Sequence, residues 1–537
     1  MSPFFEKEEV SDKGTHDNMK KIARLLALLL ACLMLVTIVA ACDEQTEGEQ
    51  GSERVEDEYG REGDDLPALN YKNDEISVLN WNAENPEFEI EQITSDNVQN
   101  ALYDRNGEIE RRLNVELKFT TEEGDVKHMK PFVALVQRVY DSRTHDFDII
   151  ASYSRTEGML AIQGYLEDLK TIDGTYINLE KPWWPDNVIE TVSIADSMYF
   201  ISGDISPNVL HQMQVIYFNK NLLNEYWNNA AQGKGFESDR DEKGKEIVSP
   251  ASRMVYQMAY DGIWTIDALI NLTRGADGNG TYRDNGTTSG VKDYNDQYGF
   301  TSTAYQIDSF YTGSNLRLIE HVDTGEVLKV SSDYGSFKTV KLVTKLGDWF
   351  KEQSCLADTN TNDLNKWDDP WAAGKAMFIA CRADHVKNLD AEWDYGVLPV
   401  PKYDNRQANY YTCMGNPFSL YGIFSGLDDL GDRAETLKEM TAVLECWASE
   451  SYRLVTPEVF EVNMQLKYAD TQYETDMFEI VRSSVVFDLG RIFSNDMAFM
   501  SELPSRCAVN GASWASTYGA YKKSLDAKLE QIVDSLV

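Results

Sequence analysis

The chain has 537 residues and a formal net charge of −39 at neutral pH, with 42% hydrophobic and 11% aromatic residues. A surface this acidic repels the phosphate backbone, so we expect no nucleic-acid partner. The length and apolar content are sufficient for two or three domains with sizeable cores.

The first 41 residues have the three-part layout of an export signal. A short cationic head (KKIAR, residues 20–24) precedes an apolar run at residues 25–41 that closes on small residues. The positive head should stay on the cytoplasmic side, which sends the rest of the chain across the membrane. Residues 1–18 lack any such pattern, so translation could begin at Met19.

Residues 39–42 (VAAC) resemble the lipobox of bacterial lipoproteins, in which the cysteine becomes the first residue and carries a diacylglyceryl group. The resemblance implies that Cys42 is lipidated and holds the protein on the outer face of the bacterial cytoplasmic membrane. Two or more acyl chains anchor a protein firmly, whereas one does so marginally. A single transmembrane helix is the alternative, because the apolar run lies at the lower edge of the spanning length.

Residues 43–65 hold eleven acidic and two basic residues without aliphatic periodicity, so they cannot bury enough apolar surface to fold. We therefore expect residues 42–70 to form a lipidated cysteine followed by a self-repelling acidic tether. The tether carries −9 of the total charge and residues 1–41 are balanced, which leaves −30 on residues 66–537. Such a charge favours solubility and does not specify a fold.

Five cysteines remain outside the signal and the anchor, without any C-x-x-C pair, and the six histidines are scattered. A zinc cluster is therefore poorly supported. An odd number means at least one free thiol unless a partner chain supplies a sulfur, and the sequence does not assign pairs. The five are Cys355, Cys381, Cys413, Cys446 and Cys507.

The region after the tether alternates strands with helices. Residues 76–81 (ISVLNW) read as a buried strand, residues 98–113 have apolar positions at near-helical spacing, and residues 115–120 (VELKFT) alternate like a strand. A second helix fits residues 132–139, and a second apolar strand follows at residues 147–150. This order predicts a parallel sheet with helices on both faces.

Ligands of such open sheets bind beyond the carboxyl ends of the strands, where loops converge. Two loops follow the predicted strands and carry small, polar or aromatic side chains. From these loops we predict as ligand-binding residues Asn82, Glu84, Asn85, Ser152 and Tyr153.

Four further segments stand out along the chain: IYFNKNLLNEY (residues 216–226), DGIWTIDALINL (residues 261–272), WAAGKAMFIA (residues 371–380) and YGVLPVPKYD (residues 395–404). In sequence and in order, they resemble segments of the family 1 extracellular solute-binding lipoproteins of sugar-type ABC importers. The resemblance implies a receptor that captures a small polar solute, expected to be a saccharide, and delivers it to ABC permease subunits.

The same resemblance implies an α/β, two-lobe fold of the periplasmic-binding-protein type II, with the ligand cleft between the lobes. We place lobe 1 at residues 71–205 plus about 414–445, and lobe 2 at residues 206–413 plus about 446–537. The helix expected at residues 513–537 would pack on lobe 2. A ligand that contacts both lobes shifts the balance from an open to a closed form. We expect a monomer.

Residues near the expected crossovers complete the candidate site. Asp204 could accept hydrogen bonds from ligand hydroxyls or merely stabilise a crossover. Arg382 offers a fork-shaped donor, with a surface ion pair as the ordinary alternative. Tyr411 and Asn416 lie in a run rich in groups that suit a sugar, although tyrosines near a crossover are also typical of hinge packing.

Local signals place two helix starts and two ambiguous motifs. Asn219 and Thr265 are expected N-caps.

Residues 183–184 (WW) could stack on a sugar, but we favour a hydrophobic plug far from the cleft. In residues 275–286 (GADGNGTYRDNG), which resemble a calcium loop, Asp277 and Asn279 would be ligands. Glycines stand at the first and twelfth positions, so we favour an exposed turn and expect no cofactor.

No catalytic motif supports an enzyme. The sequence lacks G-x-S-x-G, H-E-x-x-H and G-x-x-x-x-G-K-[ST] patterns. With 89 acidic residues, carboxylate pairs at glycosidase spacing will occur by chance, so their abundance carries no weight. A lipid-anchored glycoside hydrolase and a receptor for peptides or other non-sugar solutes stay as alternatives.

Overall fold

A computed structural model describes residues 60–185, 192–194, 197–286, 291–322, 328–358, 366–386, 389, 393–427, 431–460 and 471–536. The predicted signal segment, Cys42 and most of the acidic tether lie outside these residues. Within them, no helix combines the length and the apolar character that crossing a membrane requires.

The helices and strands fall into three stretches of the chain. The first contains β1 (Asp74–Trp81), α2 (Asn97–Leu113), β2 (Val115–Glu122), α3 (Met129–Ser142), β3 (Ile149–Tyr153), α4 (Ser154–Ile162) and α6 (Pro207–Gln212). The second contains β4 (Gln214–Asn219), α7 (Lys220–Gly233), β5 (Asp239–Arg240), β6 (Glu246–Val248), α8 (Pro250–Tyr260), α9 (Ile266–Thr273), β7 (Tyr298–Thr303), α10 (Asp308–Gly313), β8 (Ile319–His321), β9 (Leu328–Val330), α11 (Phe337–Phe350), β10 (Cys355–Asp358), α12 (Asp369–Ala372), β11 (Ala376–Arg382), η1 (Ala383–Val386) and β12 (Tyr395–Pro399). The third contains β13 (Ser419–Ile423), α13 (Arg433–Glu450), η2 (Ser451–Val455), α14 (Gln472–Ser483), α15 (Leu489–Ile492), η4 (Met500–Glu502), α16 (Leu503–Asn510) and α17 (Trp514–Leu536).

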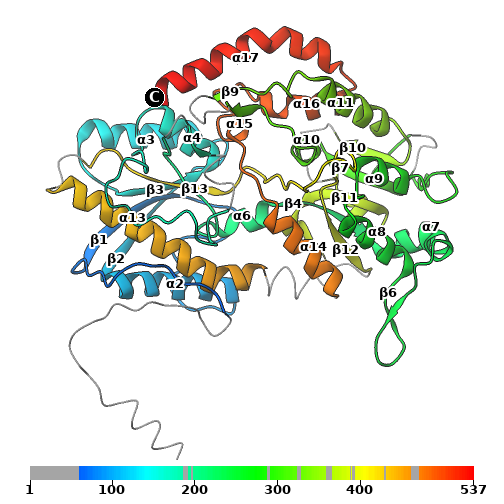
Figure 1. Ribbon diagram of the computed structural model, residues 1–537, viewed down its shortest axis with the longest axis horizontal. Coiled ribbons are helices and arrows are strands. Elements are labelled where there is room, and N and C mark those ends of the chain that lie inside the picture. The colour runs from blue at the N-terminus through cyan, green and yellow to red at the C-terminus, as the bar shows by residue number, and fades with distance from the viewer. Residues whose placement is uncertain are drawn as a thin grey trace, which may run out of the picture. The chain divides into compact units, whose positions relative to one another are not determined.

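One sheet, with the helices packed on it, forms what we call lobe 1. Its strand order is β13-β3-β1-β2, and β1 pairs in parallel with both β2 and β3. β13 joins β3 antiparallel at the edge. Figure 1 shows α3 and α4 on one side of this sheet and α2 on the other. The parallel arrangement predicted for the first three strands is therefore confirmed, although β3 begins at Ile149, two residues later than expected.

The second sheet belongs to lobe 2 and has the order β10-β7-β11-β4-β12. β10, β7 and β11 are parallel, whereas β4 runs antiparallel to both of its neighbours, β11 and β12. All six residues of β4 are buried, as expected of a strand covered on both faces. Pro399 ends the edge strand β12, where a missing N–H disrupts no ladder.

The segments that connect the lobes meet at a buried carboxylate. Glu87 accepts hydrogen bonds from Asn208 Nδ2 of α6 at 2.7 Å, and from Ser419 Oγ and Tyr421 OH of β13 at 3.0 and 2.8 Å. Arg105 Nη2 donates to the Glu87 carbonyl at 2.9 Å, and its side chain is also buried. We call these residues the Glu87 junction. It ties the segment leading into lobe 2 to the strand that follows the return to lobe 1.

The C-terminal helix contacts both lobes. We expected residues 513–537 to pack on lobe 2, and α17 does begin there, with Trp514 Nε1 donating to the Tyr334 carbonyl at 3.0 Å. At its other end the Leu536 carbonyl accepts a hydrogen bond from Tyr199 OH of lobe 1 at 2.6 Å. Figure 1 shows the helix, in red, running across both sheets.

Both predicted N-caps are confirmed. The Asn219 side chain accepts a hydrogen bond from Leu222 N at the start of α7, and Thr265 Oγ1 accepts one from Ala268 N at the start of α9. Each bond satisfies one of the amide groups that a first helical turn leaves without a partner.

We predict that Thr265→Ala lowers the free energy of unfolding by about 1 kcal/mol, because it removes this capping bond. Thr344→Ala is the matched control, since Thr344 is exposed on α11 and caps nothing. Denaturant unfolding of both variants checks the difference. Equal stabilities would contradict the assigned role of Thr265.

α13 buries a carboxyl group whose pKa is strongly raised. Glu445 is 1% exposed, and its Oε2 accepts hydrogen bonds from Trp184 Nε1 at 3.1 Å and Asn178 N at 3.2 Å. Burial outweighs these bonds and raises the pKa of Glu445 to about 8. Burial, reinforced by Asp74 and Asp148, likewise raises the pKa of Glu439 to about 7. Lobe 1 therefore retains protons that the unfolded chain releases near pH 4.

We predict from these pKa values that the free energy of unfolding falls as pH rises from about 5 to about 8, because the native state binds more protons in this window. Glu445→Gln should flatten the dependence by mimicking the protonated acid. Glu435→Gln, in the exposed first turn of the same helix, should leave it unchanged. Urea unfolding at a series of pH values measures both slopes, and a slope in Glu445→Gln equal to that of the parent would contradict the assignment.

Candidate ligand-binding site

A cavity of about 690 Å³ lies where the connecting segments meet α14. This volume falls within the usual range for small-molecule sites. Its walls come from the start of α6, from η2, from α14 and from the segment after β12. Aromatic rings dominate them: Trp183, Trp184, Tyr410, Tyr411 and Tyr452.

An ion pair forms the polar part of the cavity wall. Arg482 Nη2 of α14 lies 2.9 Å from Asp204 Oδ2, and the two side chains are 28% and 9% exposed. Burial raises the pKa of Asp204, and the charge of Arg482 opposes the shift. The pKa of Arg482 is raised chiefly by Asp204, with a smaller contribution from Glu479, which also lines the cavity. One guanidinium thus faces two carboxylates, an arrangement unsuited to an anionic ligand.

Trp183 and Trp184 lie beside Asp204, whose backbone N donates to the Trp183 carbonyl at 2.9 Å. Both side chains are buried, which agrees with the interpretation of the pair as a hydrophobic plug. Their position differs from that expectation, because both line the cavity rather than lying far from it. Trp184 is held by its bond to Glu445, and the ring centroid of Trp183 lies 6.0 Å from that of Tyr452.

Two of the predicted ligand-binding residues contact each other across the lobes. Glu84 follows β1 of lobe 1 and Arg382 ends β11 of lobe 2, yet Glu84 Oε2 lies 2.6 Å from Arg382 Nη1. Gln212 of α6 bonds to both, accepting from Arg382 at 3.2 Å and donating to Glu84 at 3.4 Å. Arg382 therefore forms an ion pair, which was the alternative interpretation of this residue.

The other predicted residues fall into two groups. Asp204 and Tyr411 line the cavity. The rest make contacts within the protein: Asn82 accepts from Gly124 N, Asn85 donates to Asn208, Ser152 donates to Glu157, Tyr153 packs against Trp81, and the Asn416 carbonyl accepts from Ser154. Ser152 has no exposed surface. The structure thus brings Asp204 and Tyr411 together and leaves the other predicted residues outside the cavity wall.

Sequence reasoning missed Arg482, Glu479 and Tyr452. α14 reads as an ordinary amphipathic helix whose buried positions include Met477, Phe478 and Val481. Nothing in that pattern distinguishes Arg482 from a solvated arginine, because its partner Asp204 lies 278 residues earlier.

The degenerate calcium loop is held by internal hydrogen bonds. Asp277 Oδ1 accepts from Asn279 N at 3.0 Å, and Asp277 Oδ2 accepts from Asn279 Nδ2 at 2.7 Å. These bonds from Asn279 lower the pKa of Asp277. The two residues predicted as calcium ligands are therefore bonded to each other in an exposed turn.

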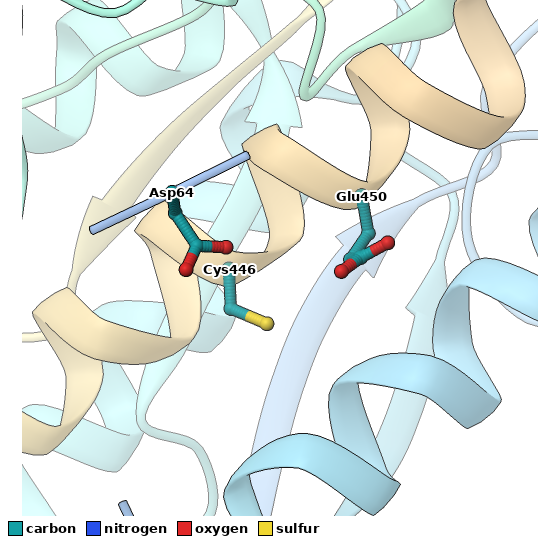
Figure 2. Close-up of side chains that lie close together, drawn as sticks. All are labelled: Asp64, Cys446 and Glu450. Carbon is teal, nitrogen blue, oxygen red and sulfur yellow. The ribbon is translucent and has the colours of Figure 1, made fainter. Parts of the chain in front are cut away.

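Among the described residues, a single group of three potential metal ligands occurs, formed by Asp64, Cys446 and Glu450 (Figure 2). Arg112 Nη1 lies 2.6 Å from Asp64 Oδ2, 2.8 Å from Glu450 Oε1 and 3.4 Å from Cys446 Sγ. Although burial alone would raise the pKa of Asp64, Arg112 lowers it. A guanidinium therefore stands where a cation would bind, and the group acts as an ion-pair network between α2, α13 and residue 64.

All five cysteines outside the signal and the anchor are free and buried. Burial raises the pKa of Cys381, Cys413 and Cys446. Since a thiolate is the reactive and metal-binding form, these thiols are poorly suited to either role.

Comparisons with known proteins bear on the fold. No protein-family model and no curated sequence matches the chain. The galacto-N-biose/lacto-N-biose I-binding protein of an ABC transporter from Bifidobacterium longum, solved with lacto-N-biose, aligns with a TM-score of 0.50 at 11% identity, covering 87% of this chain and 97% of that one. A family 1 extracellular solute-binding protein from Bifidobacterium longum subsp. infantis aligns with a TM-score of 0.49 at 12% identity, covering 85% and 99%.

The first of these likenesses agrees with the two sheets and their connections described above. At this identity it concerns the fold alone, and it confirms the two-lobe α/β architecture that the sequence resemblance implied. The chain has the fold of the extracellular solute-binding proteins.

Proposed function

We propose that the protein is a lipid-anchored extracellular receptor that captures a small neutral polar solute, a saccharide in the first instance, and delivers it to an ABC permease. The observation that carries the proposal is the aromatic cavity beside the Asp204–Arg482 pair, at the meeting of the two lobes. Aromatic faces pack on the apolar faces of sugars, and the paired charges offer donors and acceptors to hydroxyl groups.

The charges around the cavity favour a neutral solute over a cation. Three of its rings already carry an internal cation at distances of 5.8, 5.3 and 5.4 Å from the ring centroid: Lys181 over Trp183, Lys402 over Tyr410 and Arg317 over Tyr411. A ring that already attracts one cation binds a second less well, because the two cations repel each other. The facing carboxylates of Asp204 and Glu479 in turn disfavour an anion.

The anchor and the membrane location in this proposal rest on the lipobox resemblance at Cys42. A solute held near the membrane would be released close to the permease. Three of the predicted ligand-binding residues, Asn82, Glu84 and Arg382, lie outside the cavity wall. In this proposal, ligand binding changes the contacts that they make within the protein.

We predict that a neutral di- or tetrasaccharide raises the thermal midpoint of the full chain, because a ligand at 100 times its dissociation constant stabilises the native state by about 2.7 kcal/mol. The screen includes peptides and polyamines as the competing classes. Tyr411→Ala should abolish the shift by removing a stacking face, whereas Tyr305→Ala, an exposed tyrosine after β7, should not.

Three outcomes would count against the proposal. If only peptides or only polyamines raised the thermal midpoint, the solute would belong to that class and not to the saccharides. A shift that survives in Tyr411→Ala but is lost in Asn82→Ala would move the site to the loop after β1. Release of monosaccharides from the bound ligand would indicate a glycoside hydrolase.

A further inference from the structure

The chain between α14 and α16 passes from lobe 2 to lobe 1 and back. α14 packs on β12 of lobe 2, α15 packs on α4 of lobe 1, and α16 packs on α11 of lobe 2. The contact with lobe 1 is close, since a Cβ added at Gly158 of α4 would lie 3.0 Å from Ile492 Cγ2. Residues 488–502 therefore bridge the two lobes.

Two buried ion pairs connect this bridge to the lobes, one to lobe 2 and the other to lobe 1. Arg491, on the part that lies against lobe 1, is 3.1 Å from Asp308 of lobe 2. Glu502, on the part that leads into lobe 2, pairs with Arg155 of lobe 1. The four side chains are between 5% and 13% exposed. Any separation of the lobes at this place would leave buried charges without partners, which is costly.

The arginines oppose the effect of burial on both carboxyl groups. Burial, reinforced by Glu502, raises the pKa of Asp308, and the charge of Arg491 opposes this shift. Burial alone would raise the pKa of Glu502, but Arg155, Arg491 and Arg506 lower it.

α17 adds a second bridge beside the first. It is bonded to Tyr334 of lobe 2 at its start and to Tyr199 of lobe 1 at its end. Lys528 Nζ donates to the Asp496 carbonyl at 3.1 Å, which joins α17 to residues 488–502. Figure 1 shows α17 and α15 on one side of the two sheets and α14, which lines the cavity, on the other.

We propose that residues 488–502 and α17 form a strap that holds the two lobes together on one side. The lobes can then move apart only by rotating about the strap, which widens the cavity between η2 and α14. This rotation controls access to the cavity of the proposed function, but the strap rests on contacts between the lobes and not on a ligand. The strap proposal can therefore be refuted even if the protein binds a solute.

The test measures the distance between the lobes in the absence of solute. Spin labels are placed by Asp104→Cys on α2 and Asn221→Cys on α7, both exposed. The full chain also carries Cys32→Ser and Cys42→Ser in every sample, and the five other thiols are buried. Electron–electron double resonance gives the distribution of distances between the labels.

Asp308→Asn and Glu502→Gln remove one charge from each crossed pair without changing shape, and both should broaden the distribution and shift it to longer distances. Asp64→Asn is the matched control, because it breaks the equally buried Arg112–Asp64 pair inside lobe 1. It should lower the thermal midpoint and leave the distribution unchanged.

A distribution in both strap variants that equals the parent's, or equal broadening by Asp64→Asn, would overturn the strap. If a strap variant fails to fold, Tyr199→Phe decides, since it removes only the hydrogen bond to Leu536. Broadening in Tyr199→Phe supports the strap, and an unchanged distribution refutes it.

Discussion

The buried carboxylate of Glu87 is the constraint on which the arrangement of the two lobes depends. A carboxylate that is 2% exposed must be satisfied from within the protein, and three side chains, one from α6 and two from β13, supply the donors. Burial still raises its pKa. Because α6 must stay near Glu87 and β13 of the lobe 1 sheet to supply these bonds, the junction fixes the place at which the chain leaves lobe 1 for β4 of lobe 2.

Two ion pairs lie in the segments next to this junction. Glu84 and Arg382 pair across the lobes on one flank, and Asp204 and Arg482 pair on the flank that faces the cavity. Each pair joins groups on different lobes or connecting segments, so each is sensitive to lobe rotation. A neutral solute that bonds to Asp204 and Arg482 would favour the rotation in which both are in reach, which is the differential affinity that any closure requires.

Local features were predictable from the sequence, whereas the cavity was not. The strand β1 and the caps Asn219 and Thr265 depend on neighbours within a few residues, and their patterns are explicit. Ser152 and Tyr153 were expected in a loop after a strand at residues 147–150, but both belong to β3, and α4 begins directly after them. The end of this strand depends on packing by α4 and not on a local turn signal. Arg482 and Asp204 meet only because the fold brings α14 beside a residue 278 positions earlier, and no local pattern records this contact.

The most direct measurement is a crystal structure of the full chain with the solute that stabilises it most. We expect the solute to lie in the cavity against Tyr411 and to bond to the Asp204–Arg482 pair, with both lobes contributing contacts. A solute bound outside this cavity, or contacts from one lobe alone, would contradict it.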